Sequence, residues 1–155
     1  MKILVYGGTK RQRALAYSAT RFAFANELQL SAYKDANTTL YIRLAKLPAT
    51  ENHYGLAYHI SDSSWMSKNY TIQINTAIAK TTDLFLETLM HELVHIWQMA
   101  NRNLFRYSIN STRDKYVAFW KGKEYDPDKG YSKHPWERQA YRMETKLAAS
   151  YKRNK

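Results

Sequence analysis

The alternation of apolar and polar residues predicts a strand, a helix and three further strands in the first half of the chain. Residues 3–6 form a short apolar run before two glycines, and apolar residues then recur at helical spacing from residue 11 to about residue 30. Beyond this helix, apolar and polar residues alternate in three segments, which is typical of half-buried strands. The predicted strands cover residues 38–47, 55–60 and 70–78, with a turn at residues 62–64.

The second half of the chain is predicted to be mainly helical. Residues 81–83 (Thr-Thr-Asp) are typical of a helix N-terminus, and helical apolar spacing continues over residues 84–100. The other predicted elements are a helix over 113–121, a polar loop over 122–133 and a last helix over 136–152 that starts after Pro135. This order predicts an α+β fold with a small, mainly antiparallel sheet of three or four strands.

The composition indicates a single domain over residues 1–155. Of the 155 residues 45% are hydrophobic, and the chain contains no repeat or Pro/Ser-rich linker. The absence of cysteine excludes a disulfide framework, a zinc ribbon and a cysteine nucleophile, so a metal site must use His, Asp, Glu or backbone oxygen atoms. No apolar run is long enough for a membrane span or a signal peptide, so we expect a cytoplasmic protein without a membrane partner.

Charge is distributed unevenly along the chain. The net charge is +11, from 24 basic and 13 acidic residues. Residues 1–50 carry 8 basic and 2 acidic residues, residues 51–100 carry 2 and 5, and residues 101–155 carry 14 and 6. An acidic segment therefore interrupts a basic protein. The basic surface can attract nucleic acid or an acidic protein partner, and it is also compatible with a solvated surface that binds nothing specific.

The strongest functional signal is His-Glu-Leu-Val-His at residues 91–95, which matches the pattern H-E-x-x-H. Within a helix, His91 and His95 lie one turn apart on the same face, where two imidazoles can share one zinc ion. Glu92 follows the first histidine and can accept a proton from an attacking water molecule. The apolar residues around the motif indicate a buried helix. The alternative is a pair of helical histidines that bind no metal.

A catalytic zinc ion needs a third protein ligand and one open position. Glu137 is the preferred candidate, because it lies in the first turn of the last predicted helix with the small Ala140 on the same face. Glu144 can instead hold a ligating histidine by its second ring nitrogen. Two alternatives stay open: His134 can be the third ligand, and Glu137 can merely complement the helix dipole. The other acidic candidates are Glu124, Asp126 and Asp128.

These motifs resemble a known family. The H-E-x-x-H motif followed by a distant Glu-x-x-Ala helix is similar to the minimal gluzincin-type zinc metallopeptidases, which include SprT-like, ImmA/IrrE-like and small bacteriophage proteins. The stretch His134-Pro-Trp-Glu-Arg-Gln-Ala140 is close to the Pro-Trp-Glu-x-x-Ala stretch of the phage proteins. The resemblance covers residues 84–100 and 133–145. A His-Gly-x-x-Phe-like stretch, which supplies the third ligand in SprT-like proteins, is absent after the motif.

The resemblance implies a zincin-like fold, with an N-terminal helix, a small sheet, the motif helix and a ligand-bearing C-terminal helix. It implies one zinc ion per chain, bound by His91, His95 and Glu137, and Glu92 as the general base. The implied activity is hydrolysis of a peptide bond in a protein or peptide substrate. A bacteriophage origin would place the protein in the host cytoplasm.

Two further expectations concern substrate binding. The oxyanion formed during hydrolysis needs a hydrogen-bond donor. Tyr131, His134 and Tyr141 lie near Glu137 in the sequence, and Tyr131 is our choice. If the strand over residues 70–78 is a sheet edge, an extended peptide can pair with it.

A second hypothesis comes from a different class of protein. The chain can be a non-catalytic zincin-fold module, with a structural metal or none, that binds nucleic acid or a protein partner through its basic surface. Glu92 favours the enzyme, because a purely structural metal site does not need a base.

Overall fold

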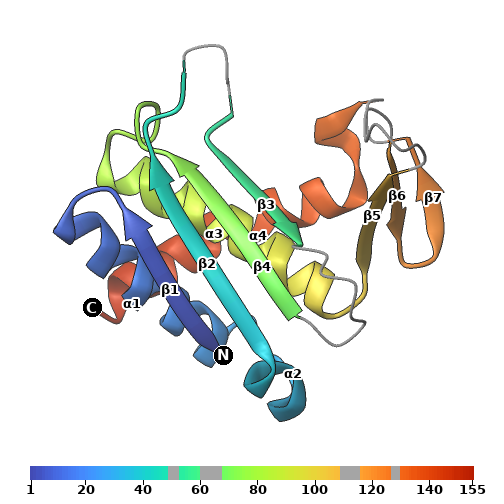
Figure 1. Cartoon of the computed structure of the whole chain (residues 1–155), viewed down its shortest axis with the longest axis horizontal. Coiled ribbons are helices and arrows are strands. Elements are labelled where there is room, and N and C mark those ends of the chain that lie inside the picture. The colour runs from blue at the N-terminus through green and yellow to red at the C-terminus, as the bar shows by residue number, and fades with distance from the viewer. Residues whose placement is uncertain (49–52, 60–67, 109–115, 127–129) are drawn as a thin grey trace.

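The computed structural model describes residues 1–48, 53–59, 68–108, 116–126 and 130–155. These residues form four α-helices and two β-sheets in an α+β arrangement (Figure 1). The elements in chain order are β1 (Lys2–Gly7), α1 (Lys10–Asn26), α2 (Ala32–Ala36), β2 (Thr38–Ala45), β3 (Gly55–His59), β4 (Lys68–Asn75), α3 (Thr82–Ala100), β5 (Leu104–Ser108), β6 (Tyr116–Trp120), β7 (Lys123–Tyr125), a 3-10 turn (Tyr131–Lys133) and α4 (Pro135–Arg153).

The larger sheet contains four strands in the order β1-β2-β4-β3. β1 and β4 both pair with β2 in parallel, and only the β3–β4 pair is antiparallel. The prediction of a mainly antiparallel sheet was therefore wrong. Alternation along a strand shows which face is buried but not how its neighbour runs. Helix α1 lies between β1 and β2 in the chain, and such a crossover returns the chain so that two neighbouring strands run the same way.

The edge strands of this sheet are β1 and β3. β4 lies between β2 and β3, so the strand considered over residues 70–78 is an inner strand, and the condition for peptide pairing with it is not met. β3 and β4 both pack against α3, and β3 is the outer strand of the two. An extended peptide that adds to the sheet on this side would therefore pair with β3.

The main core lies between the larger sheet and helices α1 and α3, which pack on one face of the sheet, and α4 packs on these two helices (Figure 1). On β2, the helix-facing residues Leu40, Ile42 and Leu44 are at most 2% exposed, whereas Arg43 between them is exposed on the other face. This is the alternation expected of a strand with one covered face. The prediction of a half-buried strand here is confirmed.

The second, smaller sheet contains β5, β6 and β7 in antiparallel order. The helix predicted over residues 113–121 was wrong: β6 occupies residues 116–120, and residues 113–115 lie outside the described part of the chain. Lys121 (φ 49°) and Gly122 (φ 82°) connect β6 to β7 with positive φ angles at both central residues, as in a type I′ hairpin. The prediction of a loop over residues 122–133 was therefore wrong in part, because residues 123–125 form β7 and residues 131–133 form a 3-10 turn.

Specific residues at the N-termini of α3 and α4 define where these two 19-residue helices begin. The side chain of Thr81 accepts a hydrogen bond from the Leu84 backbone N–H at 3.1 Å, which confirms the predicted start of α3. Pro135 occupies the first turn of α4, where its missing N–H costs no helical hydrogen bond. Ala140 is fully buried and allows α4 to pack closely on α3.

No helix among the described residues is long and apolar enough to cross a membrane. The predicted turn at residues 62–64 lies outside the described residues.

Candidate metal centre

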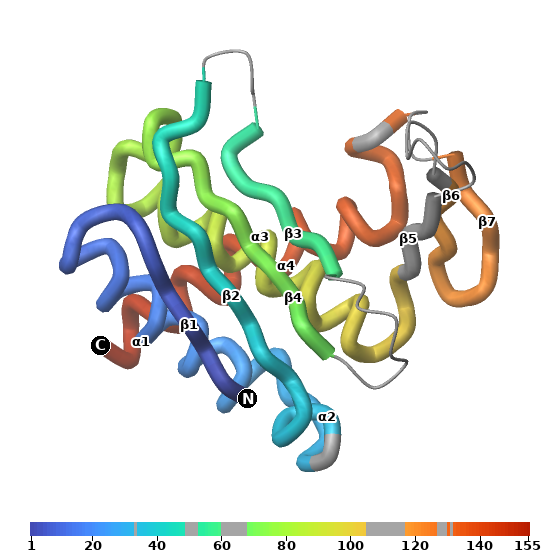
Figure 2. The backbone as a smooth tube through the Cα atoms, in the orientation of Figure 1, coloured from blue at the N-terminus to red at the C-terminus, as the bar shows by residue number. Residues whose placement is uncertain are grey.

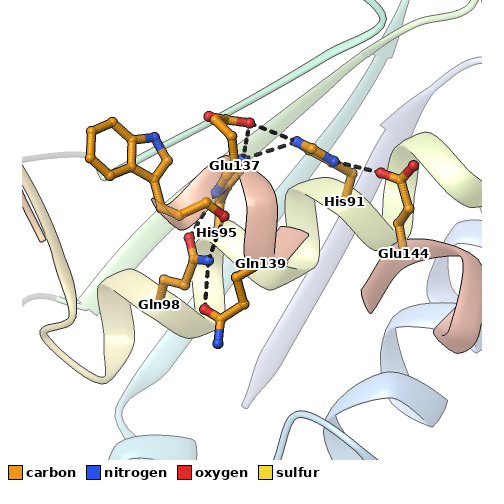
Figure 3. A network of polar contacts seen from close by, with 7 residues as sticks. His91, His95, Gln98, Glu137, Gln139 and Glu144 are labelled. Atoms are coloured by element: carbon orange, nitrogen blue, oxygen red, sulfur yellow. Dashed lines mark hydrogen bonds and ion pairs between the residues drawn. The ribbon is translucent and has the colours of Figure 1, made fainter. Parts of the chain in front are cut away.

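Three side chains from two helices meet in a buried site between α3 and α4 (Figure 3). His91 and His95 come from successive turns of α3, and Glu137 comes from the first turn of α4. The two histidine Nε2 atoms are 3.1 Å apart, and Glu137 Oε2 lies 3.1 Å from that of His91 and 3.4 Å from that of His95. The three residues are at most 9% exposed. The packing of α4 on α3 therefore brings together the ligands predicted from the sequence.

Gln98, one turn after His95, fixes the orientation of the His95 ring. Its Nε2 atom donates to the Trp136 carbonyl oxygen at 3.0 Å and to Gln139 Oε1 at 2.9 Å. The amide oxygen is therefore turned toward His95 Nδ1, 2.9 Å away. Because this oxygen can only accept a hydrogen bond, His95 Nδ1 carries the hydrogen and the lone pair of Nε2 points into the site.

Glu144 fixes the other histidine. Its Oε2 atom lies 2.6 Å from His91 Nδ1 and accepts the hydrogen of that nitrogen (Figure 3). This is the contact expected if Glu144 holds a histidine by its second ring nitrogen, as the sequence suggested. A carboxylate on the far nitrogen orients a histidine ring and makes its other nitrogen a better donor to a metal. His91 Nε2 is thus the atom available to the site.

In the absence of a metal ion, protonation of His91 stabilises the contacts of the site. Burial lowers the pKa of His91, but contacts with Glu137 and Glu144 and the charge of Glu92 outweigh this effect and raise that pKa to about 10. Burial raises the pKa of Glu137, yet its contacts with the two histidines hold that pKa well below its ordinary range. The metal-free site therefore contains a carboxylate and an imidazolium at neutral pH.

The separations of the three atoms suit a metal ion as well as a proton. Ligand atoms bound to tetrahedral zinc at about 2.0–2.1 Å lie about 3.3 Å apart. The three observed separations are 3.1, 3.1 and 3.4 Å. Two imidazole nitrogens and a carboxylate oxygen are also a donor set that divalent transition metals accept. His91, His95 and Glu137 thus form a buried group that can hold a metal ion.

Glu92 lies against the first residue of β3. It is 6% exposed. A Cβ atom added at Gly55 would lie 2.7 Å from Glu92 Oε1 and 2.8 Å from its Cγ. The carboxylate therefore packs on the backbone of Gly55, in space that any other residue would fill. The edge strand and the predicted general base are in direct contact.

Tyr141 is a phenol that the structure places beside the site. It lies one turn after Glu137 on α4, is 48% exposed, and its ring centroid is 4.7 Å from that of His91. Burial and the negative charges of the nearby glutamates raise the pKa of Tyr141. The phenol therefore keeps its hydrogen and can donate it. Tyr131, the predicted donor, begins the 3-10 turn, and its side chain lies outside the described part of the structure.

His134 is buried but points away from the metal group. Its Nε2 atom lies 3.0 Å from the Asp126 carbonyl oxygen, and its ring stacks on Trp136 with 4.3 Å between centroids. These contacts connect the start of α4 to the end of β7, so His134 as the third ligand was wrong. Glu124 and Asp126 are exposed and outside the group, and Asp128 lies outside the described residues.

Two residues of the site, Gln98 and Gly55, were not predicted from the sequence. Gln98 lies three residues after His95, a spacing at which helical side chains meet, so this signal was available. Gly55 was treated only as the start of a strand. Its role depends on the packing of β3 against α3, which no local pattern contains.

Comparisons with models of protein families, with curated proteins and with solved structures give no match to this chain. Function must therefore be argued from the site.

Proposed function

We propose that this protein is a zinc-dependent metallopeptidase. The observation that carries the proposal is the convergence of His91 Nε2, His95 Nε2 and Glu137 Oε2 within 3.4 Å of one another. A fourth residue, Glu92, is near enough for its charge to act on His91, and it does not belong to the group. A structural metal site needs no such additional carboxylate.

His91, His95 and Glu137 would hold the zinc ion, and two histidines with one glutamate are a ligand set that catalytic zinc sites use. The bound ion would act as a Lewis acid that polarises the scissile carbonyl and makes a water molecule more acidic. Gln98 and Glu144 hold the two rings with their Nε2 atoms toward the ion. The site would thus need little rearrangement to bind the metal.

Glu92 is the proposed general base. It would take the proton from the attacking water and deliver it to the amine that leaves when the peptide bond breaks. The carboxylate is confined between α3 and the backbone of Gly55, which restricts the positions it can adopt. Such confinement favours proton transfer, because the base does not have to be ordered during the reaction.

The substrate would be an extended peptide bound along β3. An edge strand offers unpaired backbone groups for a peptide that adds to the sheet. Since β3 begins at Gly55, a peptide paired with it would pass close to Glu92. Tyr141, exposed beside His91, replaces Tyr131 as the proposed donor to the carbonyl oxygen of the substrate.

The test is hydrolysis of an unstructured protein such as casein by the zinc-loaded protein, compared with the Glu92→Gln variant. We expect this variant to retain about one zinc per chain, measured by elemental mass spectrometry, and to lose at least about 100-fold in rate. Glu87→Gln on the same helix is the matched control and should keep full activity.

Equal rates for Glu92→Gln and the parent would overturn the proposed mechanism. A zinc-loaded parent that cleaves neither casein nor a mixed peptide library would overturn the peptidase and favour a non-catalytic zincin-fold module.

A further inference from the structure

The face of the larger sheet opposite α1, α3 and α4 has no helix over it among the described residues (Figures 1 and 2). Residues that alternate with the core positions of the strands point to this face. Four of them are large apolar or aromatic side chains that stay exposed. They are Leu4 (37%), Tyr6 (46%), Leu56 (40%) and Tyr58 (41%).

These side chains form two adjacent rows across the four strands, which we call the open face. In one row, Leu4 of β1 is paired with Tyr41 of β2, and Tyr58 of β3 lies at the other end of the row. In the next row, Tyr6 is paired with Arg43, and Leu56 lies at the other end. Aromatic rings therefore lie near both edges of the face, with a cation between them.

The open face is cationic. Lys2 and Arg43 are exposed on it. None of the outward-facing strand positions among the described residues is acidic. These positions are Lys2, Leu4, Tyr6, Thr39, Tyr41, Arg43, Ala45, Leu56, Tyr58, Asn69, Thr71, Gln73 and Asn75. A ligand for this face must therefore combine negative charge with flat apolar groups.

We propose that the open face binds a single-stranded nucleic acid. Unpaired bases would stack on Tyr6 and Tyr58, and phosphates would contact Arg43 and Lys2. A duplex keeps its bases stacked inside, so it could not use the exposed rings. The net charge of +11 supports the approach of a polyanion. Binding of this kind depends on rings and charge, and would show little sequence preference.

A second copy of this chain fits the face less well. Two open faces in contact would bring Arg43 and Lys2 of both copies together, and the described strand positions of the face supply no carboxylate to pair with them. An acidic polypeptide would satisfy the charge but would leave the exposed rings without stacking partners. The combination of tyrosines and cations thus favours the nucleic acid.

The test is the fluorescence anisotropy of a labelled oligothymidylate, titrated with the whole metal-loaded protein at several salt concentrations. We expect binding that weakens as salt rises, and a log–log slope that falls by about 0.7 in Arg43→Gln. The double variant Tyr6→Leu, Tyr58→Leu should lose at least about tenfold in affinity. Tyr6→Phe with Tyr58→Phe keeps both rings and should bind like the parent.

Matched controls lie in the helical layer. Tyr17→Leu changes a tyrosine that is 44% exposed on α1, and Arg142→Gln removes an exposed charge on α4. Both should bind the oligonucleotide like the parent. The proposal is overturned by no binding at low salt, by equal losses in the controls, by loss of binding in the phenylalanine variant, or by a polyglutamate probe that binds more tightly than the oligonucleotide.

Discussion

The two sides of the larger sheet satisfy their charged groups in different ways. On the helix side, His91 and His95 each contact an oxygen atom of a neighbouring side chain through Nδ1 and turn Nε2 toward Glu137. On the open face, Arg43 is exposed in a row that contains no acidic residue. The helix side thus forms a buried group that can hold a metal ion, whereas the proposed ligand of the open face is a nucleic acid.

The chain carries a net charge of +11, yet acidic side chains are concentrated at the buried histidines. Three carboxylates, from Glu92, Glu137 and Glu144, act on the buried His91 and outweigh the effect of burial on its pKa. Burial strengthens each of these interactions, because little water screens them.

Glu137→Gln should have the largest effect. The amide keeps the size of the side chain but removes the only negative charge among the three proposed ligands. We expect zinc affinity to fall by more than the approximately 10- to 100-fold that loss of a supporting residue costs, with hydrolysis falling in parallel. Competition with a chromogenic chelator measures the affinity. Glu124→Gln, an exposed acid on β7, is the control; equal affinities for these two variants would contradict the assignment.

Glu144→Ala should have a smaller effect on the same quantity. Glu144 orients His91 from 2.6 Å and does not belong to the metal group. We expect zinc affinity to fall by about tenfold, with about one zinc per chain still bound when the metal is in excess. Thr145→Ala changes the next, exposed residue of α4 and should leave the affinity unchanged. A larger loss than in Glu137→Gln would reverse the roles of the two glutamates.

Local patterns were sufficient for the elements that build the site. Helices α3 and α4 and strand β2 have strong periodicity. They begin close to the predicted positions: α3 follows its N-cap Thr81, α4 begins at Pro135 and β2 begins at Thr38. Strand order and direction could not be predicted, because alternation identifies a buried face and not a neighbour. The error over residues 113–121 has a different cause: the Lys121–Gly122 turn signal was present, but clustered aromatic residues were taken for a helical face.

For the site as well, local features could be predicted from the sequence and tertiary contacts could not. The spacing of the histidines within one helix and the position of Glu137 in a first helical turn are local features, so the metal group was predicted. His134 has similar local features, but its tertiary contacts with Asp126 and Trp136 hold it outside the group. The contact between Gly55 and Glu92 joins residues 37 positions apart and depends on which strand forms the edge.

Gly55→Ala should separate the base from the metal. The added Cβ would lie 2.7 Å from Glu92 Oε1, so the carboxylate must move. We expect hydrolysis to fall by about tenfold, because small displacements of a catalytic group are costly, while zinc content stays the same. Gly122→Ala is the control: its Cβ meets nothing within 4 Å and its φ of 82° strains the variant far from the base. Equal activities for the two variants would show that Glu92 adapts to the lost space.

The smallest expected effect is a difference in pH dependence between the metal-free and zinc-loaded proteins. The pKa of His91 in the metal-free fold is raised from 6.5 to about 10, so the unfolded chain loses this proton first. The contribution of the His91 proton to stability is therefore complete below pH 6.5 and disappears as the pH rises through about 10.

Glu137 acts in the opposite direction: its lowered pKa stabilises the fold above its ordinary value of 4.5, and this contribution is lost as the pH falls. In the proposed site, zinc would replace the His91 proton, so the zinc-loaded protein should lack this loss of stability at alkaline pH. Thermal unfolding midpoints of chelator-treated and zinc-loaded protein between neutral pH and pH 10 measure the difference, and the Glu137→Gln, Glu144→Ala double variant should remove most of it. Parallel curves for the two forms would show that the ion and the proton do not share one site.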